Sequence, residues 1–158
     1  MNSSPILIVS GEPNSVFLEL FCKVFNNNKI KSPIILISSK KLLNLQMKKL
    51  GFKNKIRLIN SSKLKFYKLD NKTINLIDVN YNTDKAFEKI SSKSNVFIKN
   101  SFELAFNTIR NNNISKFING PISKKSFLKK KFLGITEYIS KKFQTKNTCM
   151  LIYNEILS

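Results

Sequence analysis

The sequence contains no histidine and only four glycines, at positions 11, 51, 120 and 134. Without imidazole the chain has no base for a serine or cysteine triad, and it cannot form the histidine sites that many metals favour. The glycines are too far apart for a G-x-G-x-x-G dinucleotide fingerprint or a phosphate-cradling P-loop, and no G-x-S-x-G nucleophile elbow is present. These absences exclude the commonest hydrolase and nucleotide-binding motifs.

Long apolar runs are also missing, since no segment approaches the roughly 20 consecutive apolar residues that span a bilayer. The segment Met1–Ser10 lacks the charged region, apolar stretch and small-residue cleavage site of a secretory signal. Cys22 and Cys149 lie far apart within apolar segments, which favours two small core residues over a disulfide. We therefore expect a cytoplasmic protein in a reducing compartment, with no membrane partner.

Acidic residues are few, because nine aspartates and glutamates against 28 lysines and arginines give a formal net charge of +19. So basic a chain raises the hypothesis of nucleic-acid binding, with an affinity that falls steeply as salt rises. Dedicated nucleic-acid surfaces favour arginine, however, and only Arg57 and Arg110 occur. The lysines are scattered, and the abundance of Lys, Asn, Ile and Phe is typical of an A/T-rich coding sequence. Specific nucleic-acid binding is therefore the least favoured hypothesis.

Short apolar runs are present along the whole length, and 158 residues are enough for one ordinary domain. Strands are predicted at 5–10, 33–38, 55–59, 73–79, 116–119 and 148–153. Helical patterns alternate with them, which favours an α/β fold with a mostly parallel sheet and flanking helices. We expect residues 1–158 to form a single, incomplete α/β unit, and we assign no internal boundary. Because the last strand lies so near the terminus, its next sheet neighbour or its covering helix is expected on another polypeptide.

Three helices have clear signals. The first follows the first strand, with Ser15 as its expected N-cap. The second spans 40–50, and Gly51 follows it as a left-handed C-terminal cap. The third is predicted from apolar residues that share one helical face and run to the asparagines at 111–113: Ile98, Phe102, Ala105, Phe106 and Ile109.

The segment from Phe117 to Lys124 is the most informative for function. A short strand ends in Gly120-Pro121, and a lysine follows three residues later. The carboxyl edge of a parallel strand opens onto the usual ligand crevice, and an adjacent helix N-terminus binds anions. Lys124 is therefore a candidate phosphate-binding residue, although this segment alone is also typical of a simple strand-to-helix turn with a solvated lysine.

Together with two other segments, this turn resembles 4-hydroxythreonine-4-phosphate dehydrogenase, an enzyme family of pyridoxal phosphate biosynthesis. Gly11-Glu12-Pro13 followed by Glu19 is similar to the family's G-[DE]-P-A-G-I-G-P-E loop after the first strand. Gly120-Pro121-Ile122-Ser123-Lys124 is similar to its G-P-[IV]-[NH]-K turn, and Gly134-Ile135-Thr136-Glu137 to its G-H-T-E motif. The three motifs have the family's order and nearly its spacing, over nearly the entire chain.

The resemblance implies an NAD-dependent oxidation of a phosphorylated hydroxy amino acid, with a divalent metal that polarises the alcohol. It also implies a homodimer, and a fold like the N-terminal part of the isocitrate and isopropylmalate dehydrogenases. Of the family's adjacent histidine and threonine, only Thr136 carries over as a substrate contact. Ile135 replaces the histidine, and it can neither donate a hydrogen bond nor exchange a proton. We assign substrate binding to Thr136 and Lys124, and no catalytic residue.

The cofactors are implied by the resemblance alone. The family's three metal-ligating histidines lie beyond the point that matches Ser158, as do most of its dinucleotide contacts. Neither the two cysteines nor the nine carboxylates show a paired spacing that would suggest a substitute metal site. In the first loop, Ser15 and Phe17 replace two glycines of the family, and the bulky Phe17 is expected to block close approach of the backbone to a ligand.

Two main hypotheses remain open from the sequence. The chain is either a truncated, split or degenerate form of the dehydrogenase, completed by a C-terminal half, or a non-catalytic module that binds phosphate esters around Lys124 and Thr136. Nucleic-acid binding is the third.

Overall fold

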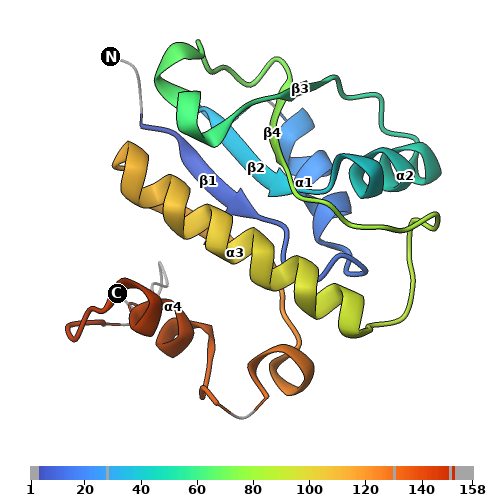
Figure 1. Ribbon diagram of the computed structural model, residues 1–158. Coiled ribbons are helices and arrows are strands. Elements are labelled where there is room, and N and C mark those ends of the chain that lie inside the picture. Colours follow the sequence, from blue (N-terminus) through green and yellow to red (C-terminus); the bar gives the residue numbers. More distant parts are fainter. Residues whose placement is uncertain (1–3, 28, 130, 150, 152–158) are drawn as a thin grey trace, which may run out of the picture. The chain divides into compact units, whose positions relative to one another are not determined.

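The computed structural model describes residues 4–27, 29–129, 131–149 and 151 (Figure 1). They pack as two compact units, within Met1–Ser123 and Lys124–Ser158. That residues 1–158 form a single, incomplete α/β unit stays a prediction.

The first unit is built on a five-stranded sheet in the order β3-β4-β2-β1-β5, and every pair of neighbours is parallel. This arrangement confirms the predicted α/β fold. The strands fall within the first five predicted ranges: β1 (Ile6–Val9), β2 (Ile34–Ser38), β3 (Ile56–Leu58), β4 (Ile74–Asp78) and β5 (Lys116–Asn119). Every residue of β2 is buried, which explains why its sequence is a continuous apolar run and not an alternating one.

Helices cover both faces of this sheet. The long helix α3 (Ser92–Asn112) crosses one face, whereas α1 (Phe17–Asn26) and α2 (Lys40–Leu50) lie on the other (Figure 1). The rings of Phe102 and Phe106 on α3 pack against Phe117 of β5, with centroids 6.3 Å from it in both cases. The predicted apolar stripe of the third helix is therefore the stripe that contacts the sheet.

The helix ends follow the local sequence. The helix α2 begins after Ser39, whose hydroxyl accepts from Leu42 N at 3.3 Å, and it ends at Gly51 with φ 77°, as predicted. The prediction of Ser15 as the N-cap of α1 is wrong, because Val16 occupies that position. The hydroxyl of Ser15 instead donates to Glu12 O at 2.8 Å, so this residue belongs to the turn that precedes the helix.

A short 3₁₀ helix, η1 (Ser61–Phe66), lies in the connection between β3 and β4, where the sequence indicated only a polar surface segment. None of the described helices is long and apolar enough to cross a bilayer.

The second unit contains a π-helical turn, η2 (Lys124–Leu128), and the helix α4 (Ile135–Phe143). Its buried described residues are Leu128 and Tyr138, and the half-buried rings of Phe127 and Phe132 pack edge-on against Tyr138 at 5.5 and 5.4 Å. Positions 150, 152 and 153 of the last predicted strand lie outside the described residues. Its described positions, 148, 149 and 151, have no regular secondary structure.

The two cysteines differ in environment. Cys22 is buried on α1, as predicted, but the prediction that Cys149 is a core residue is wrong, since it is exposed in the irregular segment after α4. Burial raises the pKa of the Cys22 thiol from 9.0 to about 11.

A thiol reagent applied to the native protein at about pH 8 is therefore expected to modify Cys149 quickly and Cys22 only after unfolding. Because the pKa of Cys22 is higher in the folded protein, the thiol ionises at a lower pH in the unfolded chain than in the folded one. The contribution of Cys22 to the free energy of unfolding therefore falls as the pH rises from 9.0 to about 11. Timed labelling with mass spectrometry, on Cys22→Ser and Cys149→Ser variants, checks the assignment. Rapid native labelling of the Cys149→Ser variant would contradict it.

Candidate functional site

Two of the three sequence motifs meet at the carboxyl edge of the sheet. Because β1 and β5 are adjacent and parallel, the loops that follow Val9 and Asn119 leave the sheet side by side. Gly120 N donates to Val9 O and Glu12 N donates to Pro121 O, both at 2.7 Å. The Gly11-Glu12-Pro13 loop and the Gly120-Pro121 turn are therefore in direct backbone contact.

This contact requires glycine at both positions. A Cβ atom on Gly120 would lie 2.2 Å from Ser10 O, and one on Gly11 would lie 2.3 Å from Pro121 O. Gly11 also has φ 70°, a left-handed conformation that side chains disfavour. Both distances are too short for any real side chain, so the glycines of these two motifs are explained by the crossing of the loops.

Glu12 is the central polar residue of this edge and is only 6% exposed. Its Oε1 accepts two long hydrogen bonds, from Asn14 N at 3.3 Å and Asn14 Nδ2 at 3.4 Å, and its Oε2 has no hydrogen-bond partner. Asn14 also accepts from Glu88 N at 2.9 Å and donates to the Tyr81 hydroxyl at 3.4 Å. Asn14 thus joins the loop after β1 to the segment after β4.

Gln46 of α2 strengthens the same connection. Its buried Nε2 donates to Pro13 O at 2.9 Å and to Ala86 O at 2.8 Å. Because these two carbonyls belong to the loop after β1 and the segment after β4, the amide of Gln46 fixes both relative to α2. Sequence reasoning assigned no role to Glu12, Asn14 or Gln46; the Gly-Glu-Pro motif was the only signal for any of them.

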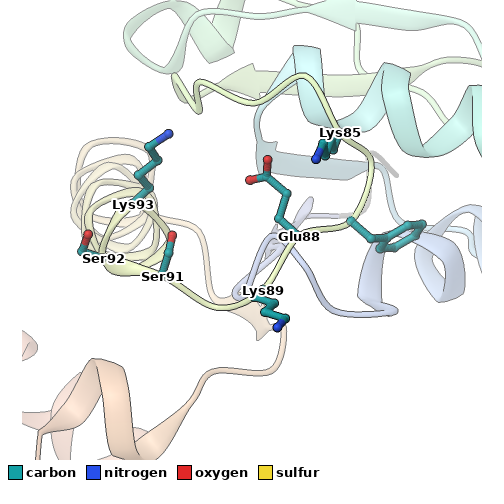
Figure 2. A pocket seen from close by; sticks show the side chains of 7 residues that line it. Lys85, Glu88, Lys89, Ser91, Ser92 and Lys93 are labelled. Carbon is teal, nitrogen blue, oxygen red and sulfur yellow. The ribbon is translucent and has the colours of Figure 1, made fainter.

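A surface hollow of about 570 Å³ lies beside this network, at the start of α3 (Figure 2). Figure 2 shows Glu88 extending between Lys85 and Lys93. All of the residues that line the hollow are exposed except Phe87, which is half-buried. The lining residues are Lys85, Phe87, Glu88, Lys89, Ser91, Ser92 and Lys93. Nearby, the hydrogen bond and charge of Lys41, followed by the charge of Lys93, hold the pKa of Asp84 below its usual value.

The predicted substrate residues lie in the second unit. Lys124 is the exposed first residue of η2, and Thr136 is the half-buried second residue of α4, directly after Ile135. Gly134 is the N-cap of α4, and it has no side chain that could cap the helix. The carboxylate of Glu137 folds back to 3.0 Å from the position that a Cβ atom on Gly134 would occupy. No hydrogen bond between described residues joins Lys124 to Thr136, so their shared role in substrate binding stays a prediction.

The residues present do not fit the metal or the dinucleotide that the resemblance implies. The sequence has no histidine, and the described residues contain no group of three or more Cys, Asp or Glu that would hold a metal ion. At the carboxyl edge of the first unit, backbone atoms occupy the space beside Gly11 and Gly120, as the two short Cβ distances show. A pyrophosphate therefore cannot approach these glycines.

The parallel sheet, covered on both faces and closed by glycine loops at its carboxyl edge, defines an α/β protein of the doubly wound kind. The family model of the Pyridoxal phosphate biosynthetic protein PdxA matches residues 29–158, and the chain belongs to this family. The match confirms the family indicated by the three motifs. It includes the second and third motifs, while the Gly11-Glu12-Pro13 loop precedes it.

Solved structures share the fold. A putative 4-hydroxythreonine-4-phosphate dehydrogenase from Salmonella typhimurium superposes with a TM-score of 0.82 at 16% identity, over 97% of this chain and 48% of that chain. The enzymes from Burkholderia phymatum and Klebsiella pneumoniae each give 0.78 over 91% of this chain, at 20% and 15% identity, and 44% and 46% of their own chains. The chain thus spans less than half the length of these structures. No curated protein matches it.

Proposed function

We propose that this chain provides the phosphate-binding part of a 4-hydroxythreonine-4-phosphate dehydrogenase-like protein, and that its ligand is a phosphorylated hydroxy amino acid. The observation that carries the proposal is the family match across the Gly120-Pro121 turn and the Gly134–Glu137 motif. The shared fold of three solved structures with that enzyme name supports it.

In this proposal the phosphate binds at Lys124 and at the first turn of α4. The ammonium group of Lys124 is exposed and available to an anion. The N-terminal N–H groups of α4 attract negative charge, and the Thr136 hydroxyl adds a donor in the same turn. The Glu137 carboxylate opposes an anion there, whereas the net charge of +19 raises the local concentration of anionic ligands.

Oxidation requires residues that this sequence does not contain. None of its side chains is a histidine, and its carboxylates and thiols do not form a metal site among the described residues. We therefore propose that these 158 residues bind the ligand and do not oxidise it alone. NAD, a divalent metal, a homodimer and a cytoplasmic location remain expectations from the family, and a complementary C-terminal half would have to supply the cofactor ligands.

The variants Lys124→Ala and Thr136→Ala are expected to weaken binding of 4-phosphohydroxythreonine about tenfold each, because each removes a charge-assisted hydrogen bond to phosphate. Isothermal titration calorimetry measures the affinities. Lys146→Ala and Thr145→Ala are matched controls, since they make the same changes at exposed positions after α4 and are expected to bind like the wild type. Unchanged affinity in both test variants would exclude this phosphate site.

A further inference from the structure

Another hollow of the first unit, of about 750 Å³, lies at the amino edge of the sheet. It is lined by Pro5 and Pro33, which directly precede β1 and β2, and by Asn71, which lies three residues before β4. Because these three strands are parallel neighbours, their amino ends meet at one edge, opposite the edge that carries the glycine loops. The volume lies within the range of roughly 300–1,000 Å³ that is usual for small-molecule sites.

The side-chain amide of Asn71 joins the two chain segments that form the walls of this hollow. Its Oδ1 accepts from Ile34 N at 2.9 Å, and its Nδ2 donates to Ile30 O at 3.0 Å and to Ser32 O at 2.9 Å. These three partners belong to the segment that leads into β2, whereas Asn71 belongs to the segment that follows η1. The walls are therefore held in place before a ligand arrives, which lowers the entropic cost of binding.

The charged side chains that line the hollow are mainly basic. They are Lys31, Lys65 and Lys68, against the single carboxylate of Asp70, so their net charge is +2. The Oδ1 atom of Asp70 already accepts from Lys72 N at 2.9 Å, within its own turn. A phosphate monoester carries a charge of roughly −2 at neutral pH, which complements this lining.

The same hollow has an apolar and aromatic part. Leu69 and Tyr67 are half-buried in its lining, whereas the ring of Phe66 is 73% exposed. The ammonium group of Lys65 lies 5.2 Å from the centroid of the Phe66 ring. An exposed phenyl ring beside a cationic group is a surface on which a flat aromatic ring can stack while its anionic substituent meets the cation.

We propose that this hollow binds a small aromatic phosphate, with the ring of the ligand on Phe66 and its phosphate at Lys65 and Lys68. A phosphate without a ring would use only the basic part of the lining, and an uncharged ring only the aromatic part. The site is independent of the proposed function, because all of its residues belong to the first unit and lie at the amino edge of the sheet.

The test compares phenyl phosphate with cyclohexyl phosphate, which has the same charge but no flat ring. Isothermal titration calorimetry of the wild type is expected to show an affinity about tenfold higher for phenyl phosphate, because only its ring can stack. Phe66→Ala is expected to remove this preference, and Lys68→Ala to weaken both ligands about fivefold through the lost charge. Lys63→Ala is the matched control, since Lys63 is an exposed lysine of η1 outside the lining of the hollow.

The Lys124→Ala variant separates this site from the phosphate site of the proposed function. The preference for phenyl phosphate is expected to persist in that variant, and amide chemical shifts in NMR spectra are expected to change at Phe66 and Asn71. Absence of binding, equal binding of the two phosphates, or an unchanged preference in Phe66→Ala overturns the proposal. Loss of phenyl phosphate binding in Lys124→Ala also overturns it, while that result supports the proposed function.

Discussion

Replacement of Gly120 by alanine is expected to lower the free energy of unfolding of the first unit by about 3 kcal/mol or more. The added Cβ would lie 2.2 Å from Ser10 O and 2.6 Å from Ser10 C, and both atoms belong to the backbone of the neighbouring strand's loop. They cannot move away as a flexible side chain would. The two loops must separate, which also breaks the 2.7 Å hydrogen bonds from Gly120 N and Glu12 N.

Gly51→Ala is the matched control for this prediction. Gly51 has φ 77°, and nothing lies within 4 Å of the position of its Cβ. Alanine at position 51 is expected to lower the free energy of unfolding only by the cost of the left-handed backbone conformation, about 1–2 kcal/mol. Urea unfolding followed by circular dichroism gives both values, and a loss at Gly120 no larger than that at Gly51 would show that the loops do not cross as described.

The strands and helices of the first unit could be predicted because each has a local signal. Continuous apolar runs, ended by turn residues, marked β1 and β2, and a mainly apolar segment interrupted by Asn75 marked β4, each within one or two residues of its observed ends. The helix α2 was predicted with its observed bounds, because Gly51 adopts the left-handed conformation that ends it. The position of α1 was less accurate, since the hydroxyl of Ser15 binds backward to Glu12 O and does not act as the N-cap.

The polar network at the carboxyl edge could not be predicted in the same way. Asn14 binds Glu88 N, 74 residues further along the chain, and Gln46 binds carbonyls 33 and 40 residues away. Such contacts depend on which loops the sheet order brings together, and they leave no periodic pattern in the sequence. The burial of Glu12 has the same origin, because the β1–β5 pairing places the Gly120-Pro121 turn against its loop.

The contact between the two loops also bears on the family match. The matched residues begin at position 29, after the Gly11-Glu12-Pro13 loop. That loop is nevertheless in backbone contact with the Gly120-Pro121 turn, which the match includes. The two glycines constrain each other sterically, since each Cβ would strike the backbone of the other loop. A change in either loop must therefore be compatible with the other, which explains why both sequence motifs occur together.

Phe102→Ala is expected to cost about 3–5 kcal/mol, because it removes a fully buried ring from the contact between α3 and the sheet. The ring lies 5.7 Å from that of Phe106 and 6.3 Å from that of Phe117, so its loss leaves a cavity bordered by both. Phe66→Ala makes the same change at a ring that is 73% exposed, and it is expected to cost less than about 1 kcal/mol. Urea unfolding compares them, and equal losses would contradict the described core.

Phe102 also supports the site, because Phe117 belongs to β5 and that strand leads directly into the Gly120 turn. Hydrogen exchange of the Gly120 amide, which donates to Val9 O, reports the local stability of the turn. In Phe102→Ala this amide is expected to exchange faster, relative to the wild type, than it does in Phe66→Ala.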